Sequence, residues 1–479
     1  MSAISQRSSA RFENSPHEAW NWRDVAYLVQ LSRALDTLEE TAFAPQRKIF
    51  YQFSARGHDM AQILLGLQLT RTDDAVCGYY RSRPILLALG VDPVDALGSS
   101  LARSGGYSDG RDIGAVFNYP NARGASALPM CGGVGAQFTP TVGWAQALDY
   151  RARVLNEKTC GDAIAVALGG DASVATNGFW SALTIATTLK LPMLFYIEDN
   201  GFGISVPSTL QTPGASISAN LRGFHDLEIV AGDGTSPAEA AELIERSVRY
   251  VRGQRTPLLL HLKVPRLEGH SFQDTQTYKS EAFVKSEWAR DPLPKLRDYL
   301  VPALFDAGEW DRIATTAAET VEKARIAAEA RPTADLGRTV KNVFFEGELQ
   351  EKGGQWNAGY VAPDASDTPS SEGARINMVT AIRRTLENEL AINPRVVVFG
   401  EDVGAKGGVH AVTLGLQEKF GQARVFDTSL SEEGIIGQLG RFQVGGKHKR
   451  DFEWDSKRVS IVQREVIHVP VQRHNPAVE

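Results

Sequence analysis

Cysteine is scarce in this sequence. Its 479 residues contain three cysteines, Cys77, Cys131 and Cys160, which lie far apart and form no Cys-x-x-Cys pair or Cys/His cluster. A disulfide framework needs an even set of closely spaced cysteines, and a thiolate zinc site needs paired ligands. The sequence therefore excludes both as organising features, and so few cysteines are typical of a reducing compartment.

Long apolar runs are also missing. The longest, AIAVALGG at residues 163–170, is far shorter than the ~20 residues that a membrane-spanning helix needs. The first twenty residues are polar and contain no apolar core of a signal peptide. We therefore expect a soluble, cytoplasmic protein that has no membrane partner.

An excess of positive charge is missing as well. Lys and Arg number 51 against 57 Asp and Glu, which gives a net charge of −6. This balance disfavours a nucleic-acid partner, which would require a basic surface. The proportions of apolar and charged residues, 43% and 23%, are ordinary for a globular protein. No Gly-x-Gly-x-x-Gly follows a predicted strand, so a nicotinamide dehydrogenase is also disfavoured.

Strand and helix patterns alternate through the middle of the chain. We predict buried strands at residues 163–170, 192–200 and 257–264, with helices at 178–191 and 237–252 between them. Strands and helices in this order join into a parallel sheet through right-handed crossovers. The sequence therefore predicts an α/β fold with a parallel sheet flanked by helices.

Composition divides the chain into five segments. A polar start precedes the alternating region, and a Gly-, Pro-, Ser- and Asp-rich linker separates it from a second alternating region and a final His- and Arg-rich stretch. The segments are 1–22, 23–331, 332–372, 373–437 and 438–479. We expect the first to be flexible and the second and fourth to be α/β domains. We expect the last to be an aberrant tail, with no helix to complete the fourth segment.

Two polar residues stand at the carboxyl ends of consecutive predicted strands. Asp171 follows one strand and Asn200 ends the next, so both lie at the edge of a parallel sheet where ligands bind. A carboxylate, an amide oxygen and the Phe202 carbonyl form a half-shell of oxygen ligands that suits Mg²⁺ and a diphosphate. Gly170 would allow the backbone to approach that diphosphate. Taken singly, Asp171 could equally cap a helix and Asn200 form a turn, but their spacing favours the metal site.

Four sequence blocks in order then point to a family. Residues 57–81 (GHDMAQILLGLQLTRTDDAVCGYYR), 132–148 (GGVGAQFTPTVGWAQAL), 169–205 and 266–274 (RLEGHSFQD) resemble the alpha subunit of the thiamine-diphosphate-dependent, decarboxylating dehydrogenase of 2-oxoacid dehydrogenase complexes. Residues 377–437, which end in VFDTSLSEEGIIG, resemble the opening of that family's beta subunit. The chain thus resembles an alpha–beta fusion of the branched-chain and pyruvate dehydrogenase type, with a truncated beta half. The implied fold is a thiamine-diphosphate-binding domain followed by the start of a second one.

The resemblance implies thiamine diphosphate and Mg²⁺ as cofactors. It implies that Asp171, Asn200 and the Phe202 carbonyl hold the metal. The groups that would neutralise the diphosphate are Tyr80, Arg81 and Arg266, of which the arginines can donate in pairs. Further cofactor contacts implied by the same blocks are Gly132, Val134, Gly170, Ala172 and Ser173.

Two residues are implied in catalysis itself. Glu432, in Ser-Glu-Glu-Gly, matches the beta-subunit glutamate that protonates the aminopyrimidine ring of the cofactor. His270, in Gly-His-Ser, matches a loop over the reactive end of the cofactor and implies acid/base help in acyl transfer. Without the resemblance, these residues would be an exposed turn and a structural histidine. Glu198 departs from the branched-chain pattern, which often has Arg there, and a carboxylate aimed at the phosphates would repel them.

The resemblance implies oxidative decarboxylation of a 2-oxo acid, either pyruvate or a branched-chain acid, with acyl transfer to a lipoyl group. The implied partners are the lipoyl-bearing acyltransferase and a second copy of the fused chain. Two alternatives stay open: a truncated product without activity, and a transketolase-like transferase that uses the same cofactor. The Gly-His-Ser loop and the Ser-Glu block disfavour the second alternative.

Overall fold

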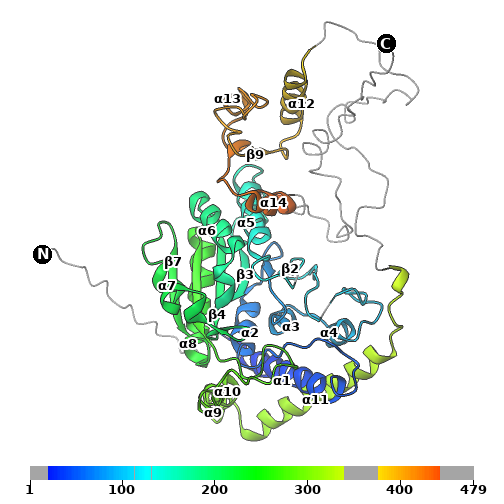
Figure 1. The fold of residues 1–479 in the computed structure, drawn as a ribbon. Coiled ribbons are helices and arrows are strands. Elements are labelled where there is room, and N and C mark those ends of the chain that lie inside the picture. The colour runs from blue at the N-terminus through cyan, green and yellow to red at the C-terminus, as the bar shows by residue number, and fades with distance from the viewer. Residues whose placement is uncertain (1–19, 113, 131, 339–375, 443–479) are drawn as a thin grey trace, which may run out of the picture.

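A six-stranded, all-parallel sheet forms the centre of the molecule (Figure 1). The computed structural model describes residues 20–338, except 113 and 131, and residues 376–442. The strands follow the order β2-β1-β3-β4-β8-β7. Their bounds are β1 Ala75–Cys77, β2 Ser126–Ala127, β3 Ala165–Gly170, β4 Met193–Asp199, β7 Glu228–Asp233 and β8 Leu258–Lys263. The expected α/β architecture with a parallel sheet is confirmed.

Helices cover both faces of this sheet. α5 and α6 pack on one face, α2 and α8 on the other, and α1 lies outside α2 against α11. α1 continues directly into a π-helical turn, η1. The bounds of the helices are α1 Trp22–Leu38, η1 Glu39–Phe43, α2 Asp59–Gln68, α3 Arg83–Ala88, α4 Pro93–Ser100, α5 Phe138–Arg153, α6 Asn177–Leu189, α7 Ile217–Asn220, α8 Pro237–Gln254, α9 Glu281–Trp288, α10 Pro292–Leu300 and α11 Ala307–Ala330.

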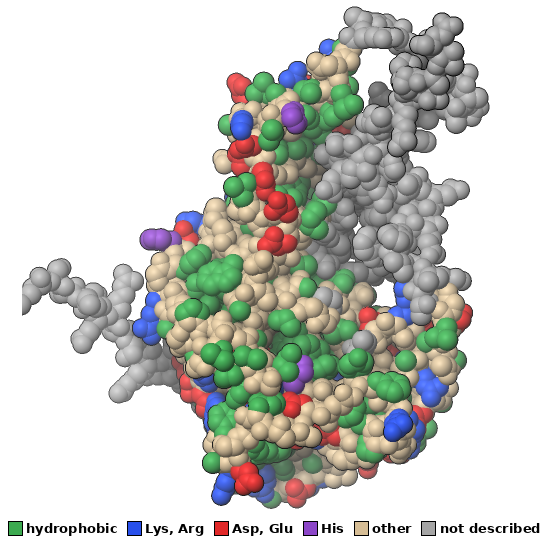
Figure 2. All heavy atoms as spheres, in the orientation of Figure 1, with side chains coloured by type: hydrophobic (Ala, Val, Ile, Leu, Met, Phe, Trp, Pro, Cys, Tyr) green, Lys and Arg blue, Asp and Glu red, His purple; other side chains and the backbone are tan. Residues whose placement is uncertain are grey.

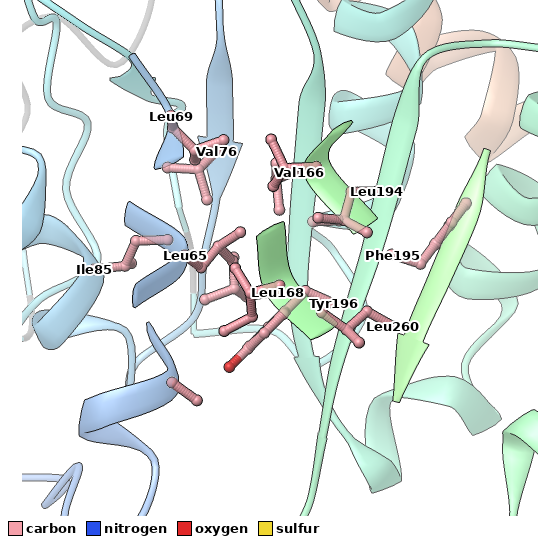
Figure 3. Close-up of a cluster of buried hydrophobic side chains, with 14 of the residues drawn as sticks. Leu65, Leu69, Val76, Ile85, Val166, Leu168, Leu194, Phe195, Tyr196 and Leu260 are labelled. Atoms are coloured by element: carbon pink, nitrogen blue, oxygen red, sulfur yellow. The ribbon is translucent and has the colours of Figure 1, made fainter. Parts of the chain in front are cut away.

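The central strands are apolar on both faces because helices bury both of them. Side chains of successive residues on β4 point to opposite faces, so Leu194 and Tyr196 turn toward α2 while Phe195 turns away (Figure 3). Phe195 packs against the rings of Phe138 in α5 and Phe179 in α6. A central strand such as β4 therefore packs against helices on both faces of the sheet.

The register of β3 and β4 decides where the polar residues at their ends lie. Gly170, the last residue of β3, pairs with Glu198 near the end of β4. Asp171 therefore begins the loop after β3 beside the turn that contains Asn200. The loop after β4 continues into a small antiparallel pair, β5 (Phe202–Gly203) with β6 (Val206–Pro207).

A second, smaller region follows the part of the chain that the structure leaves undescribed. Its two strands, β9 (Val398–Gly400) and β10 (Val425–Asp427), are parallel. Three helices accompany them: α12 Met378–Ile392, α13 Leu416–Phe420 and α14 Glu432–Phe442. The prediction that no helix follows the last strand of this region is wrong, since α14 occupies that place. The start of a second domain is confirmed.

α14 packs across α5 at a close crossing of two glycines. A Cβ atom on Gly143 would lie 2.5 Å from the Gly437 carbonyl oxygen, and one on Gly437 would lie 2.4 Å from Thr139 Cβ. The buried side chain of Gln438 also donates to Gln146. α14 therefore docks on α5 through Gly437 and Gln438, which are buried, while Ile436 remains 58% exposed.

The other predicted elements match in kind, with bounds that differ by a few residues. The edge strands β2 and β7 were not foreseen, since the first has two residues and the second is only partly buried. Trp22, which was assigned to a flexible start, already begins α1 with a buried ring. Residues 1–19 and most of the predicted linker and tail fall outside the described residues. No helix in the described chain has the length and apolar character to cross a bilayer.

Candidate functional site

A cavity of about 770 Å³ lies at the carboxyl ends of β3 and β4. Its size falls in the usual range for small-molecule sites. Twelve residues proposed from the sequence line it: Tyr80, Arg81, Gly132, Val134, Gly170, Asp171, Ala172, Ser173, Asn200, Phe202, Arg266 and His270. Glu432 is the one proposed site residue that does not. Tertiary structure thus brings together four blocks that are up to 200 residues apart.

Asp171 is a buried carboxyl group without a side-chain hydrogen-bond partner in the described chain. It opens the 3₁₀ turn η3 (Asp171–Ala175) and is 5% exposed, and only backbone N–H groups, those of Asp171 and Asn200, lie near its oxygens as donors. Burial and the nearby charge of Asp199 raise the pKa of Asp171 to about 7. A buried acid in this state lacks a counter-charge. A cation bound at its oxygens would supply one.

Asn200 faces Asp171 from the turn after β4. Its Oδ1 accepts a hydrogen bond from the backbone N–H of Phe202 at 3.1 Å, and its Nδ2 lies 3.2 Å from Nε2 of the buried His58. Gly201 has φ +82°, a left-handed conformation that favours glycine and lets the chain reverse here. The turn therefore brings Asn200 and Phe202 to the lining of the cavity.

Asp199 ties this turn to the neighbouring strand. One carboxylate oxygen accepts the Gly201 N–H at 3.0 Å, and the other contacts His261 Nε2 at 2.8 Å and Lys263 Nζ. Burial alone would raise the pKa of Asp199, but the hydrogen bonds from His261 and Lys263 lower it below its usual value. Nδ1 of His261 in turn lies 2.8 Å from Ser218 Oγ. Asp199 is thus a charged anchor for the turn.

Metal-binding capacity here depends on few protein groups. Among residues 20–338 and 376–442, no three His, Cys, Asp or Glu side chains gather as a metal cluster. A cation at this edge would therefore bind Asp171, the Asn200 amide oxygen and a backbone carbonyl, and would take further oxygens from a ligand. Mg²⁺ accepts such mixed oxygen shells.

Two buried arginines give the cavity its positive charge. Arg81 donates to the backbone carbonyls of Ser54 and His270, and Arg266 donates to the Ile204 carbonyl and to Tyr278. Burial and the charge of Arg81 lower the pKa of Arg266, and its Nε has no hydrogen-bond partner in the described residues. An anionic group in the cavity would stabilise the charged form of Arg266 and would accept a hydrogen bond from its Nε.

His270 lies at the aromatic wall of the cavity. Its ring makes edge contacts with Phe53 and Tyr80, both at 5.4 Å between centroids. Burial, followed by the charges of Arg81 and Arg266, lowers the pKa of His270 to about 4. The ring is therefore neutral at pH 7 and can accept or donate one proton.

The departure at Glu198 has a structural resolution. Its carboxyl group accepts hydrogen bonds from Gln62 and Tyr79, both at 2.9 Å, and from Tyr196 at 3.4 Å. Burial raises the pKa of Glu198 to about 8, so the group is mostly uncharged at pH 7. It does not line the cavity, and the expected repulsion of phosphates does not arise.

Glu432 lies at the first residue of α14, exposed and outside the cavity lining. Its neighbours anchor the helix: Ser431 Oγ donates to Ser181 Oγ, which donates to Glu433, both at 2.8 Å. Acidic side chains cover the surface where α14 begins (Figure 2). A role for Glu432 in activating a cofactor stays a prediction.

Several lining residues were not proposed from the sequence. Half of them are aromatic or apolar, among them Tyr51, Phe53, Val116, Met130 and Ile204, and the others include Arg111, Asp112, Gln137 and Gln211. Only the fold brings these positions together, so no sequence signal identifies them. His58 behind the cavity was also missed, although it belongs to the block that begins at Gly57.

Comparisons with known proteins agree with this geometry. The family model described as "Dehydrogenase E1 component" matches residues 27–336, more than half of the chain. The model described as "Transketolase, pyrimidine binding domain" matches residues 374–448, so that match continues past the predicted boundary at 437.

The relatives of the first region are alpha subunits, and those of the second region are beta subunits. The alpha subunit of the pyruvate dehydrogenase E1 component from Zymomonas mobilis is 28% identical over 276 residues, covering 56% of this chain and 74% of the relative. A chloroplastic alpha subunit from Arabidopsis thaliana is 26% identical over 284 residues, covering 58% and 64%. The beta subunit from Staphylococcus epidermidis is 56% identical over 64 residues, covering 13% of this chain and 20% of the relative.

The second region therefore spans about a fifth of the beta relative, whereas the first spans most of an alpha subunit. The expected thiamine-diphosphate-type fold and the order of alpha-like and beta-like parts are confirmed by these matches. On the match over residues 27–336, the chain belongs to the dehydrogenase E1 component family.

Proposed function

We propose that the cavity binds thiamine diphosphate with Mg²⁺ and that the chain is an E1 component, which decarboxylates a 2-oxo acid. The observation that carries this proposal is Asp171, a buried carboxylate that no side chain of the described residues pairs with, in one cavity with Asn200 and two buried arginines. A magnesium diphosphate has the complementary charges. The cavity volume of about 770 Å³ also suits a cofactor of this size.

The binding roles follow from the contacts. Asp171, the Asn200 amide oxygen and the Phe202 carbonyl would hold the metal. Arg81 and Arg266 would donate to the diphosphate, and the open space at Gly132 would let the backbone approach it. When bound, the cofactor supplies a stabilised carbanion for the loss of CO₂.

The protein would supply positioning and protons. Neutral His270, against Phe53 and Tyr80, would exchange a proton with the reacting group at the open side of the cavity. Glu432 would hold a proton at the aminopyrimidine ring nitrogen. Glu432 would have to approach the cavity for this, and the contacts of α14 with α5 and α6 support this only in so far as they attach Glu432 to the first region.

Partners and substrate belong to the same proposal. The alpha-like and beta-like parts favour an assembly of two fused chains, and the acyl group would pass to the lipoyl group of an acyltransferase. Pyruvate is the first candidate substrate, because the relatives above are pyruvate dehydrogenase subunits. Branched-chain 2-oxo acids are the second. The first domain would run from Trp22, where α1 begins, to residue 331, and the second would begin near residue 373 and continue past 437 through α14. We propose that the protein acts in the cytoplasm.

Calorimetry tests the binding step. Thiamine diphosphate should bind the 479-residue chain with an affinity that falls when EDTA removes Mg²⁺. Binding of equal strength with and without Mg²⁺ would overturn the metal assignment. Pyruvate and branched-chain 2-oxo acids, offered with a dye acceptor, then test decarboxylation.

A chain that binds the cofactor without turnover is the second candidate function. The chain spans only a fifth of the beta relative, and Glu432 does not line the cavity. If binding is tight and dye reduction is absent, co-expression with a complete beta subunit should restore activity. In that complex, Glu432→Gln should slow proton exchange at the thiazolium carbon without weakening cofactor binding. Unchanged exchange would remove Glu432 from the proposal.

A further inference from the structure

We infer that His58 is a positioning residue that orients the Asn200 amide so that its oxygen, and not its nitrogen, faces the metal. This inference rests on the magnesium site proposed above. Asn200 has one side-chain oxygen and one NH₂ group, and only the oxygen can bind a cation. A rotation of the amide by 180° would turn two donors toward the metal.

Two contacts determine the amide orientation. The Phe202 N–H donates to Oδ1 at 3.1 Å, and Nδ2 lies 3.2 Å from His58 Nε2. Oδ1 retains a second lone pair for a metal. Among the described residues, His58 is the only side chain that hydrogen-bonds to Nδ2, so it fixes the position of the NH₂ group.

The tautomer of His58 decides whether its Nε2 hydrogen-bonds to the oxygen or to the nitrogen of the Asn200 amide. A neutral imidazole accepts at one nitrogen and donates at the other. If Nε2 carried the proton, it would attract the amide oxygen and turn the NH₂ group toward the metal. The ring is fully buried, and with its proton on Nδ1 the ring accepts from Asn200 at Nε2.

The backbone holds His58 in place. Its N–H donates to the Ala55 carbonyl at 2.9 Å, and its carbonyl accepts the Gln62 N–H at 3.2 Å in the first turn of α2. Gly57 has φ +96°, and a Cβ atom there would lie 2.0 Å from the Pro265 carbonyl oxygen. Only glycine permits this approach, so the His58 backbone is fixed beside the segment that contains Arg266.

The ring has no competing side-chain contact in the described chain. Among the side chains of the described residues, the Asn200 amide is the only hydrogen-bond partner of the ring, and the Arg56 backbone is its other polar neighbour. Buried polar groups are normally hydrogen-bonded, and the side chain that pairs with this ring is Asn200. Here the partner is the proposed metal ligand.

The test compares an acceptor with a non-acceptor at position 58. His58→Gln keeps an acceptor at similar reach, and His58→Leu removes it. We measure the Mg²⁺ concentration that gives half-maximal thiamine diphosphate binding, and the thermal midpoint without metal or cofactor. His58→Leu should raise that concentration about tenfold, and His58→Gln should stay within about threefold of the parent. The matched control is His225→Leu, an exposed histidine.

A second background separates orientation from packing. In Asn200→Asp both terminal atoms are oxygens, so rotation of the group no longer matters. His58→Leu should therefore shift Mg²⁺ dependence by less than about threefold in that background. A loss of equal size in both backgrounds, or His58→Leu that binds like the parent, would overturn the inference.

Two further outcomes remain decisive. If the parent binds the cofactor without any need for Mg²⁺, the proposed metal site fails, and this is visible before any variant is compared. If His58→Leu lowers the thermal midpoint, His58→Met replaces it, because methionine also lacks an acceptor of comparable strength. His58→Gln that binds as poorly as His58→Met would contradict the inference.

Discussion

The chain contains two α/β regions that differ in how far each can stabilise itself. The first has a six-stranded sheet with helices on both faces, and its core extends across all the layers. The second has two strands and a small core of Leu386, Leu390, Val398, Leu416 and Val425. A sheet of two strands is marginal in water unless something packs against it.

Contacts to the first region provide that support. α14 crosses α5 at the two glycines, Tyr150 Oη donates to the Pro394 carbonyl at 2.7 Å, and Arg395 pairs with Glu157 at 2.8 Å. The second region therefore depends on the first, while the first has its own core and cavity. The difference teaches that the cavity lies at the carboxyl ends of two central strands, β3 and β4, whereas the two-stranded sheet of the second region has no central strand.

The largest expected effect concerns the ligand site. Asp171→Ala should abolish Mg²⁺-dependent binding of thiamine diphosphate, because it removes the only carboxylate proposed for the metal. Asn200→Ala should do the same. Calorimetry measures both, with the exposed Asp162→Ala as control. Parent-like affinity in Asp171→Ala would move the site elsewhere, whereas both regions should remain folded.

Core truncations compare the two regions directly. Phe195→Ala removes a ring buried between α5 and α6 and should lower the free energy of unfolding of the first region by about 3–5 kcal/mol. Leu390→Ala should cost about 2–3 kcal/mol in the second region only. Hydrogen exchange resolved by region measures both. Equal loss of protection in the first region with Leu390→Ala would show that the two unfold as one unit.

The glycine crossing tests the dependence itself. Gly437→Ala should weaken docking of α14 by about 1–3 kcal/mol, since its Cβ would lie 2.4 Å from Thr139. Faster exchange and proteolysis should then appear within residues 376–442 alone. Gly253→Ala is the control, because that helical position has open space around it. Alanine there should raise the free energy of unfolding by about 0.5–1 kcal/mol. Unchanged proteolysis in Gly437→Ala would mean that the second region stands without α14.

The smallest effect is a dependence on pH that belongs to the first region. Burial and the charge of Asp36 raise the pKa of Glu40 to about 7, despite its pairing with Arg56. A raised carboxyl pKa stabilises the folded state below the unfolded value, near 4.5, and this contribution is lost as pH rises toward 7. Glu40→Gln should therefore reduce the change in the free energy of unfolding between pH 4.5 and pH 7 by about 1–2 kcal/mol. Thermal midpoints measure this, with the exposed Glu242→Gln as control, and a parent-like slope in Glu40→Gln would assign it to another group.

Sequence reasoning located Asp171, Asn200, Arg81 and Arg266 because each lies in a short contiguous block. The alternation of strands and helices then implied that the ends of β3 and β4 share one edge. Glu432 shows the limit of this reasoning. Its Ser-Glu-Glu-Gly block resembles the beta subunit, but its distance from a cavity depends on how α14 docks on α5.

His58 was missed for a related reason. Nothing near it in the sequence distinguishes a histidine that supports a ligand from one that only fills space. Its contact with Asn200 spans 142 residues and exists only once α2 and β4 are packed. Burial of Glu198 among Gln62, Tyr79 and Tyr196 is equally a product of packing, and it converts an expected repulsion into a neutral carboxyl.

The sequence by itself determined the order of strands and helices, the parallel sheet and the residues at the strand ends. These follow from local periodicity and from the handedness of crossovers, which act over tens of residues. Only the tertiary structure decided which aromatic side chains line the cavity, which acids are charged and where α14 packs. Those properties depend on burial and on the distances between charges, and both arise only when segments distant in the sequence come into contact.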